Sequence, residues 1–181
     1  MRRLPRAVLE AYLTGPEQVR PQELIWGMVN EPPAPFFGHQ AIVTRALVLL
    51  ERHVREQDAG IVCVSPIDVV LDADRALVVQ PDIIFVSRER TAIIRDQVWG
   101  APDLVLEVES PGTRRRDRTT KVGWYRQYGV RECWLLDPRS QTMTVMHLAA
   151  VAARRQSFQG TRRIESAVLP HFAQPAASFF T

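Results

Sequence analysis

The chain has 181 residues, of which 46% are hydrophobic and 24% are charged, as in ordinary soluble globular proteins. This length suits one domain, residues 1–181, with a sizeable hydrophobic core. The net charge of +3 and the isoelectric point near 9.3 permit nucleic-acid binding without requiring it.

The sequence offers no signal for a membrane protein or a disulfide scaffold. No apolar run approaches the ~20 residues that a membrane span requires, and the N-terminal stretch lacks a signal-peptide cleavage site. We therefore expect a cytoplasmic protein with no membrane partner. Cys63 and Cys133 each lie in an apolar run, so we expect buried free thiols, without zinc-binding spacing.

The first half of the chain predicts a hairpin, a long helix and then short strands. Residues 23–29 indicate a strand or hairpin, and the proline-rich residues 31–38 indicate a loop that enters a helix. Apolar residues recur at helical spacing over residues 39–55, which predicts that helix. Short β-branched runs then predict strands at residues 61–64, 67–71, 76–79 and 82–86.

The second half predicts a strand, a helix and a hairpin. Residues 103–108 form a short apolar run that ends at Pro111 and Gly112. Helical periodicity returns over residues 115–128, where Trp124, Tyr125 and Tyr128 are expected to be core residues. Residues 132–137 and 142–148 predict a hairpin, followed by a weaker signal for one more strand. These elements predict a mixed α/β fold with antiparallel hairpins and flanking helices, and with a peripheral N-terminal helix and C-terminal tail.

Three acidic residues and one lysine stand out among these elements. Asp82 begins one predicted strand, Glu107 lies inside another, and Glu109 follows two residues later on the same face. Burying a carboxylate is costly unless it meets a cation, a metal or donors. Carboxylates near a strand edge suit a hard divalent cation such as Mg²⁺, which can activate water and stabilise phosphoryl charge.

Lys121 is the only lysine in the chain, and the other 22 of the 23 basic residues are arginine. A compact ammonium near the carboxylates would contact a nucleophilic water and a phosphate, a role that a planar guanidinium does not fill. The alternative is that a lone lysine is an accident of the arginine-rich composition. Asp117 lies four residues before Lys121 and would either hold the ammonium or form a surface pair.

The residues from 101 to 138, APDLVLEVESPGTRRRDRTTKVGWYRQYGVRECWLLDP, together with PDIIFV at 81–86, resemble a known family. They are similar to the Uma-type putative restriction endonuclease family of the PD-(D/E)xK nuclease superfamily. The resemblance extends over residues 22–148. It implies a restriction-endonuclease-like fold with a mixed central sheet, in which Cys133 replaces a tyrosine of the family pattern.

By this resemblance, Asp82 and Glu107 would bind metal and Lys121 would be the catalytic lysine, moved from the strand to the following helix. The superfamily places its lysine two residues after the acidic residue, where this chain has Glu109, a weaker candidate ligand. His39 matches a histidine of the family and is either auxiliary or structural. An acidic residue near the predicted hairpin is a further candidate, with Glu31 favoured over Glu23.

The predicted function is a Mg²⁺- or Mn²⁺-dependent endonuclease that hydrolyses DNA phosphodiester bonds and acts as a homodimer. An arginine run would contact phosphates, and it comprises Arg114, Arg115, Arg116 and Arg118. The alternative is an inactive nuclease-fold domain that binds nucleic acid or a partner protein. A third hypothesis is an assembly protein in which the hairpin at residues 142–148 is exposed and pairs with a second copy.

Overall fold

The computed structural model describes residues 5–16, 21–110, 116–149 and 154–181. Its helices are α1 (Pro5–Leu13), α2 (Phe37–Glu56) and α3 (Val122–Tyr128). Short helical turns complete them, namely η1 (Arg88–Ile93), the π-helical η2 (Arg116–Lys121) and η3 (Ala176–Phe179).

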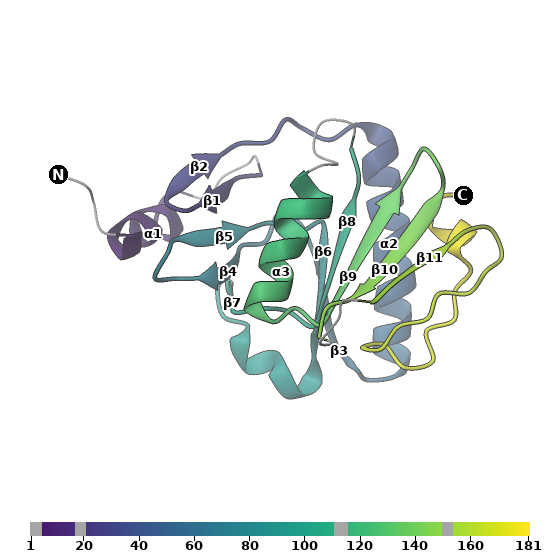
Figure 1. Ribbon diagram of the computed structural model, residues 1–181. Helices are drawn as coiled ribbons and strands as arrows, with labels where there is room; N and C mark the ends of the chain where they lie inside the picture. Colours follow the sequence, from purple (N-terminus) through teal and green to yellow (C-terminus); the bar gives the residue numbers. More distant parts are fainter. Residues whose placement is uncertain (1–4, 17–20, 111–115, 150–153) are drawn as a thin grey trace.

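The strands of the described residues form two sheets (Figure 1). The six-stranded sheet has the order β11 (Arg154–Phe158), β10 (Thr142–His147), β9 (Glu132–Asp137), β8 (Leu104–Val108), β6 (Ile83–Ser87) and β3 (Gly60–Val64). The five-stranded sheet has the order β2 (Met28–Asn30), β1 (Glu23–Ile25), β5 (Leu77–Val79), β4 (Val69–Asp72) and β7 (Val98–Trp99).

The register of the larger sheet places the acidic strand ends side by side. β6 and β8 are antiparallel, with Ile83 opposite Leu106, so Asp82 comes next to Glu107. β8 and β9 are parallel, and the chain crosses between them through η2 and α3. A parallel pair needs such a crossover, and this one carries Lys121 back over the sheet beside β8.

Side chains alternate across β8 and bury two different cores. One face packs against α2, through Leu104 and Leu106 on the strand and Ala46 and Leu50 on the helix, all of which have no exposed surface. The other face, through Val105, packs with α3 and the five-stranded sheet. The site strand therefore lies between layers, and full burial of each large apolar side chain contributes roughly 1.5–3 kcal/mol.

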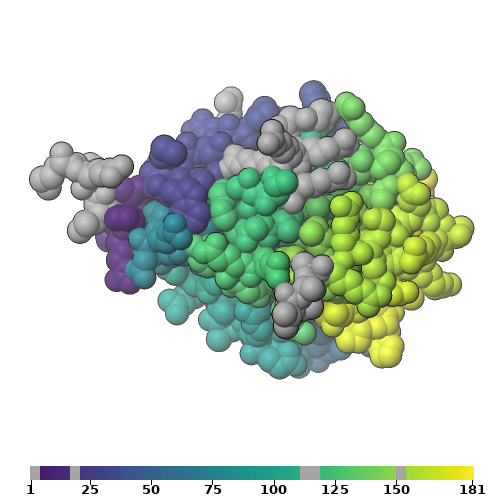
Figure 2. Space-filling model, viewed as in Figure 1, coloured from purple at the N-terminus to yellow at the C-terminus, as the bar shows by residue number. Residues whose placement is uncertain are grey.

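The residues of α1, in purple, and the C-terminal residues, in yellow, lie at opposite ends of the molecule (Figure 2). α1 packs through Leu9 with residues of the five-stranded sheet. The C-terminal segment packs Phe172 and Phe179 around the buried Trp134 of β9.

The predicted mixed α/β fold is confirmed, and the hairpin at residues 23–29, the long helix and the hairpin of β9 and β10 form as predicted. One central sheet was expected, but β4 and β5 belong to the second sheet. The sequence contains no signal that separates one sheet from two, because the division depends on pairing between strands that are far apart in the chain. The predicted helix at residues 115–128 begins as the π-helical turn η2.

Three smaller predictions have clear outcomes. Cys133 is a buried free thiol as expected, whereas Cys63 is only half-buried because it lies on the edge strand β3. The hypothesis of a pairing hairpin at residues 142–148 is wrong, because β10 is already paired on both sides by β9 and β11. Among the described residues, no helix is both long enough and apolar enough to span a membrane.

Candidate active site

The first carboxylate of the site is fixed by the pairing of β6 and β8. Asp82 precedes β6, and its Oδ2 accepts a hydrogen bond of 2.7 Å from the backbone N–H of Val108. The Asp82 side chain is 20% exposed, so it faces an opening and not the core. The backbone of one strand thus holds the carboxylate of its neighbour beside Glu107.

Glu107 is a buried carboxylate in the middle of the protein, with only 4% of its surface exposed. Its Oε1 accepts a hydrogen bond of 2.5 Å from the hydroxyl of Tyr125, which lies on α3. The same oxygen lies 3.2 Å from Nζ of Lys121. A buried carboxylate is tolerated when donors and an opposite charge meet it, and both are present here.

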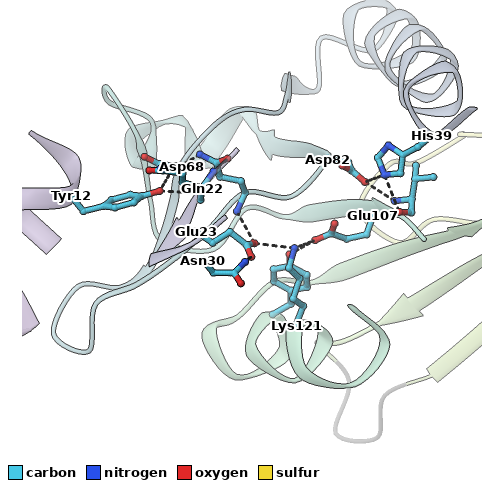
Figure 3. Close-up of polar contacts among 12 residues, drawn as sticks. Tyr12, Gln22, Glu23, Asn30, His39, Asp68, Asp82, Glu107 and Lys121 are labelled. Carbon is cyan, nitrogen blue, oxygen red and sulfur yellow. Dashed lines mark hydrogen bonds and ion pairs between the residues drawn. The ribbon is translucent and has the colours of Figure 1, made fainter. Parts of the chain in front are cut away.

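Lys121 is the last residue of η2 and lies between two carboxylates (Figure 3). Its Nζ is 3.2 Å from Glu107 Oε1 and 3.0 Å from Glu23 Oε1, and the residue is 7% exposed. Although 14 residues separate Lys121 from Glu107 in the sequence, the crossover brings the ammonium to the carboxylate. The predicted approach of the helical lysine to the strand is therefore present.

Glu23 is the acidic residue of the cleft that the sequence analysis ranked below Glu31. It is 4% exposed, and its Oε1 contacts Lys121 and accepts a 3.4 Å hydrogen bond from the N–H of Gln80. Glu31, which the sequence analysis favoured, is exposed, and its Oε1 accepts a hydrogen bond from Gln22. The signal that distinguishes them is the strand itself: Glu23 directly precedes the apolar Leu24 and Ile25, whereas Glu31 begins a proline-rich loop.

His39 lies in the first turn of α2 and contacts the carboxylate of Asp82 (Figure 3). Its Nε2 is 3.1 Å from the carbonyl oxygen of Val108 and 3.3 Å from Asp82 Oδ2. Burial alone lowers the pKa of His39, but the contacts with Asp82 and the Val108 carbonyl outweigh it and raise the pKa above its usual value. The arrangement favours a hydrogen atom on Nε2.

These side chains share one cleft with a volume of about 710 Å³. The polar residues of the site that line it are Glu23, His39, Asp82, Glu107, Glu109 and Lys121. Glu109 is 3% exposed, and its backbone N–H donates to the carbonyl of Leu136 on β9. The cleft therefore brings together charged side chains from β1, from the adjoining ends of β6 and β8, from α2 and from η2.

A family pattern matches most of the chain. The match covers residues 9–177, and the matching family is Uma2, described as "Putative restriction endonuclease". The chain belongs to the Uma2 family. The family match is wider than the stretch of residues 22–148 that carries the resemblance in the sequence, and it adds the second half of α1 and strand β11.

A solved structure shares the fold of this Uma2 chain. It is the crystal structure of a "putative nuclease belonging to DUF820" from Anabaena variabilis, with a TM-score of 0.78 and 20% sequence identity. The likeness covers 95% of this chain and 96% of the other, so it extends over both sheets and the helices. No curated protein matches the Uma2 chain.

A chain of polar contacts leads outward from the site of the Uma2 chain to α1 (Figure 3). Gln80 donates its backbone N–H to Glu23 and its side-chain amide to Asp68 at 2.9 Å. The hydroxyl of Tyr12 on α1 lies 3.4 Å from the same Asp68 oxygen and donates to the carbonyl of Gln22 at 2.9 Å. Burial raises the pKa of both Tyr12 and Asp68. Gln80 and Tyr12 therefore both form hydrogen bonds with the start of the hairpin of β1 and β2, which contains Glu23.

Part of the predicted site of the Uma2 chain cannot be placed. Arg114 and Arg115 lie outside the described residues, and for Arg116, Asp117 and Arg118 only the backbone, within η2, is described. Within the described residues, no three histidine, cysteine, aspartate or glutamate side chains gather as a metal-binding group.

Proposed function

We propose that this chain is a metal-dependent endonuclease that hydrolyses phosphodiester bonds of DNA. The observation that carries the proposal is the ammonium of Lys121 between Glu107 and Glu23, in a cleft that also contains Asp82. A fixed cation in a partly enclosed cleft is suited to stabilise the charge that develops on a phosphoryl group. Membership of the Uma2 family supports the same activity.

The oxygen donors where β6 meets β8 fit a hard divalent cation such as Mg²⁺ or Mn²⁺. Asp82 Oδ2 and the carbonyl oxygen of Val108 both contact the one N–H group of His39, so they converge on a point that favours positive charge. Glu107 adds a second carboxylate, and Glu109 is a weaker third candidate. Mg²⁺ needs only one or two protein carboxylates, because water and phosphate oxygens complete its shell.

When bound there, the ion would make a water more acidic and neutralise phosphate charge. The residues of the chain would do the remaining work. While Glu107 and Glu23 hold it, Lys121 Nζ would donate one hydrogen bond, to a phosphate oxygen or to the attacking water. Tyr125 orients Glu107, and the Val108 N–H orients Asp82. Glu23 holds the ammonium from the side opposite to Glu107.

The arginine run before Lys121 is proposed to contact the DNA backbone. It comprises Arg114, Arg115, Arg116 and Arg118, and it ends three residues before the lysine in the sequence. Each phosphate that an arginine neutralises releases counterions, so affinity for DNA is expected to fall as salt is added. We also propose that the protein acts as a homodimer in the cytoplasm.

The test is a nicking assay on supercoiled plasmid with Mg²⁺ or Mn²⁺. We expect the wild type to nick, and Asp82→Ala, Lys121→Ala and Lys121→Arg to lose about 100-fold or more in rate. Lys121→Arg is informative because it keeps the charge but places a larger, planar group in a buried site. Arg52→Lys, an exchange of cations at an exposed position of α2, is the matched control and is expected to cut normally.

The outcomes separate the hypotheses. Equal cutting by the wild type and Lys121→Ala would contradict the proposal, as would the absence of nicking with every metal. A salt-dependent shift of DNA in a gel without any cleavage would instead support the alternative, an inactive nuclease-fold domain that binds nucleic acid or a partner protein.

A further inference from the structure

Two adjacent phenylalanines, Phe36 and Phe37, lie where the loop after β2 enters α2. Phe36 is 79% exposed and Phe37 is 89% exposed, the two highest values among the exposed large apolar side chains that the structure describes. Single exposed apolar residues are common on protein surfaces and need no explanation. A neighbouring pair of nearly bare aromatic rings points to a binding role.

Phe36 lies beside the candidate active site, and Phe37 follows it as the first residue of α2. Phe36 lines the same cleft as Asp82 and Lys121. His39, which touches Asp82, follows Phe36 by three residues, or about one helical turn of 5.4 Å. Figure 1 shows the connection from β2 to α2 running along one edge of the molecule. A phosphate bound beside Asp82 would bring the adjoining nucleotide to these rings.

The backbone before the rings is stiff. Pro32, Pro33 and Pro35 precede Phe36, and each proline fixes its own φ and restricts the residue before it. These prolines limit the backbone conformations of the segment that leads into Phe36. Little backbone conformational entropy is therefore lost when a ligand covers the rings.

We infer that Phe36 and Phe37 stack on an unstacked base next to the scissile phosphate, which makes single-stranded or locally kinked DNA the substrate. This inference rests on the proposed function. Aromatic side chains bind bases through their flat faces, and those faces are accessible only in single strands or where a wedge opens a duplex step. A second copy of the chain seated on Phe36 would close the mouth of the cleft, so the bases of the substrate are the better occupant.

The experiment measures binding without cutting. The full chain is titrated in Ca²⁺ against oligonucleotides with one 2-aminopurine, as a single strand and as a duplex, and gels verify that the DNA stays intact. Anisotropy reports affinity, and quenching of 2-aminopurine reports stacking. We expect the Phe36→Ala/Phe37→Ala double variant to bind about ten-fold or more weakly and to lose the quenching.

Two further variants isolate the aromatic face. Phe36→Leu/Phe37→Leu keeps apolar side chains but removes the flat rings, so it is expected to lose the quenching as the alanine variant does. Val48→Ala removes an apolar side chain that is 61% exposed on α2 but does not line the cleft, and it is expected to match the wild type. Quenching in the single strand alone assigns unpaired DNA, and quenching in both assigns a kinked duplex.

The contrary outcomes are distinct. If the wild type binds DNA without quenching, or the alanine variant binds and quenches like the wild type, this inference fails while the proposed function stands. If the wild type binds neither oligonucleotide, both fail. A change from dimer to monomer in the alanine variant, with unchanged affinity for DNA, would assign the rings to contact between chains and overturn the inference.

Discussion

At the scale of single residues, the only lysine of the chain lies where an ammonium fits and a guanidinium does not. Lys121 is buried, and its Nζ is 3.0 and 3.2 Å from carboxylate oxygens of Glu23 and Glu107. A compact point charge satisfies two carboxylates that approach from different elements, whereas arginine presents a planar fork that suits one carboxylate. The position of the amine, and not the charge alone, gives the residue its role.

Glu23 is expected to be essential for the activity, in contrast to Glu31. Glu23→Gln removes a charge that holds the ammonium 3.0 Å away, so we expect the plasmid nicking rate to fall about ten-fold or more, with little change in DNA affinity. The matched control is Glu31→Gln, the same exchange at an exposed position of the same region. Equal losses in both variants, or no loss in Glu23→Gln, would show that the contact with Lys121 is only structural.

The residues of the site differ in how far the sequence could predict them. Asp82, Glu107 and Lys121 were predicted as one group because their motifs resemble a family, and the structure brings Lys121 to Glu107. Glu23 was ranked below Glu31 although its place in an apolar strand was a local signal, and its contact with Lys121 further depends on the register of β1 against β5. No local pattern encodes that register. The contact of His39 with Asp82 likewise depends on where α2 starts relative to β6.

At the scale of elements, a second buried carboxylate joins the strands at the end opposite to the site. Asp103 has no exposed surface and precedes β8. Its Oδ2 accepts from the N–H of Ser87 at 2.8 Å, and its Oδ1 accepts from Arg90 at 3.0 Å and Arg131 at 3.1 Å. One side chain thus connects the end of β6 and the start of β9 to β8, and so supports the register that aligns Asp82 with Glu107.

This cluster gives a pH dependence of stability. Burial alone raises the pKa of Asp103, but the hydrogen bonds from Ser87, Arg90 and Arg131 outweigh it and lower the pKa below its usual value. A lowered folded-state pKa contributes stability above the unfolded pKa of about 4, and this contribution is lost as the pH falls through the folded-state value. We expect Asp103→Asn to cost about 2 kcal/mol at pH 7 and to converge with the wild type at low pH.

Urea denaturation between pH 7 and about pH 3 measures the free energy of unfolding of Asp103→Asn and of the wild type. Asp96→Asn makes the same exchange at an exposed position and is expected to follow the wild type throughout. If the free energies of unfolding of Asp103→Asn and the wild type differed by the same amount at every pH, protonation of Asp103 would not destabilise the fold, and this prediction would be wrong. The sequence contained no sign of this cluster, because its three donors come from separate elements.

At the scale of the whole molecule, the two sheets pack so that the site strand is covered on both faces and opens only at one end. Helix α2 covers one face of β8, and α3 with the five-stranded sheet covers the other. The hairpin of β1 and β2 then supplies Glu23 from the smaller sheet. The number of strands was largely predictable, but their division into two sheets was not, because it depends on long-range pairing. That division is what brings Glu23 to Lys121.

One cleft with the proposed activity would cut one strand of DNA, so double-strand cleavage would call for two copies of the chain. The strands of DNA are antiparallel, and a twofold pair of chains would present one site to each. We expect the protein to sediment at twice the chain mass of 20.6 kDa, and to convert plasmid to linear product with little accumulation of nicked circles. The surface through which two chains pair must leave the part of the cleft at Phe36 accessible to DNA.

Mixing chains tests this directly. Pairs of one wild-type and one Asp82→Ala chain keep a single working site, so mixtures are expected to accumulate nicked circles in proportion to the mixed pairs. Dilution below the dissociation constant is expected to have the same effect on the wild type. A protein that sediments at the mass of one chain at every concentration, and forms nicked circles before linear product, would instead be a monomer that cuts each strand in a separate encounter.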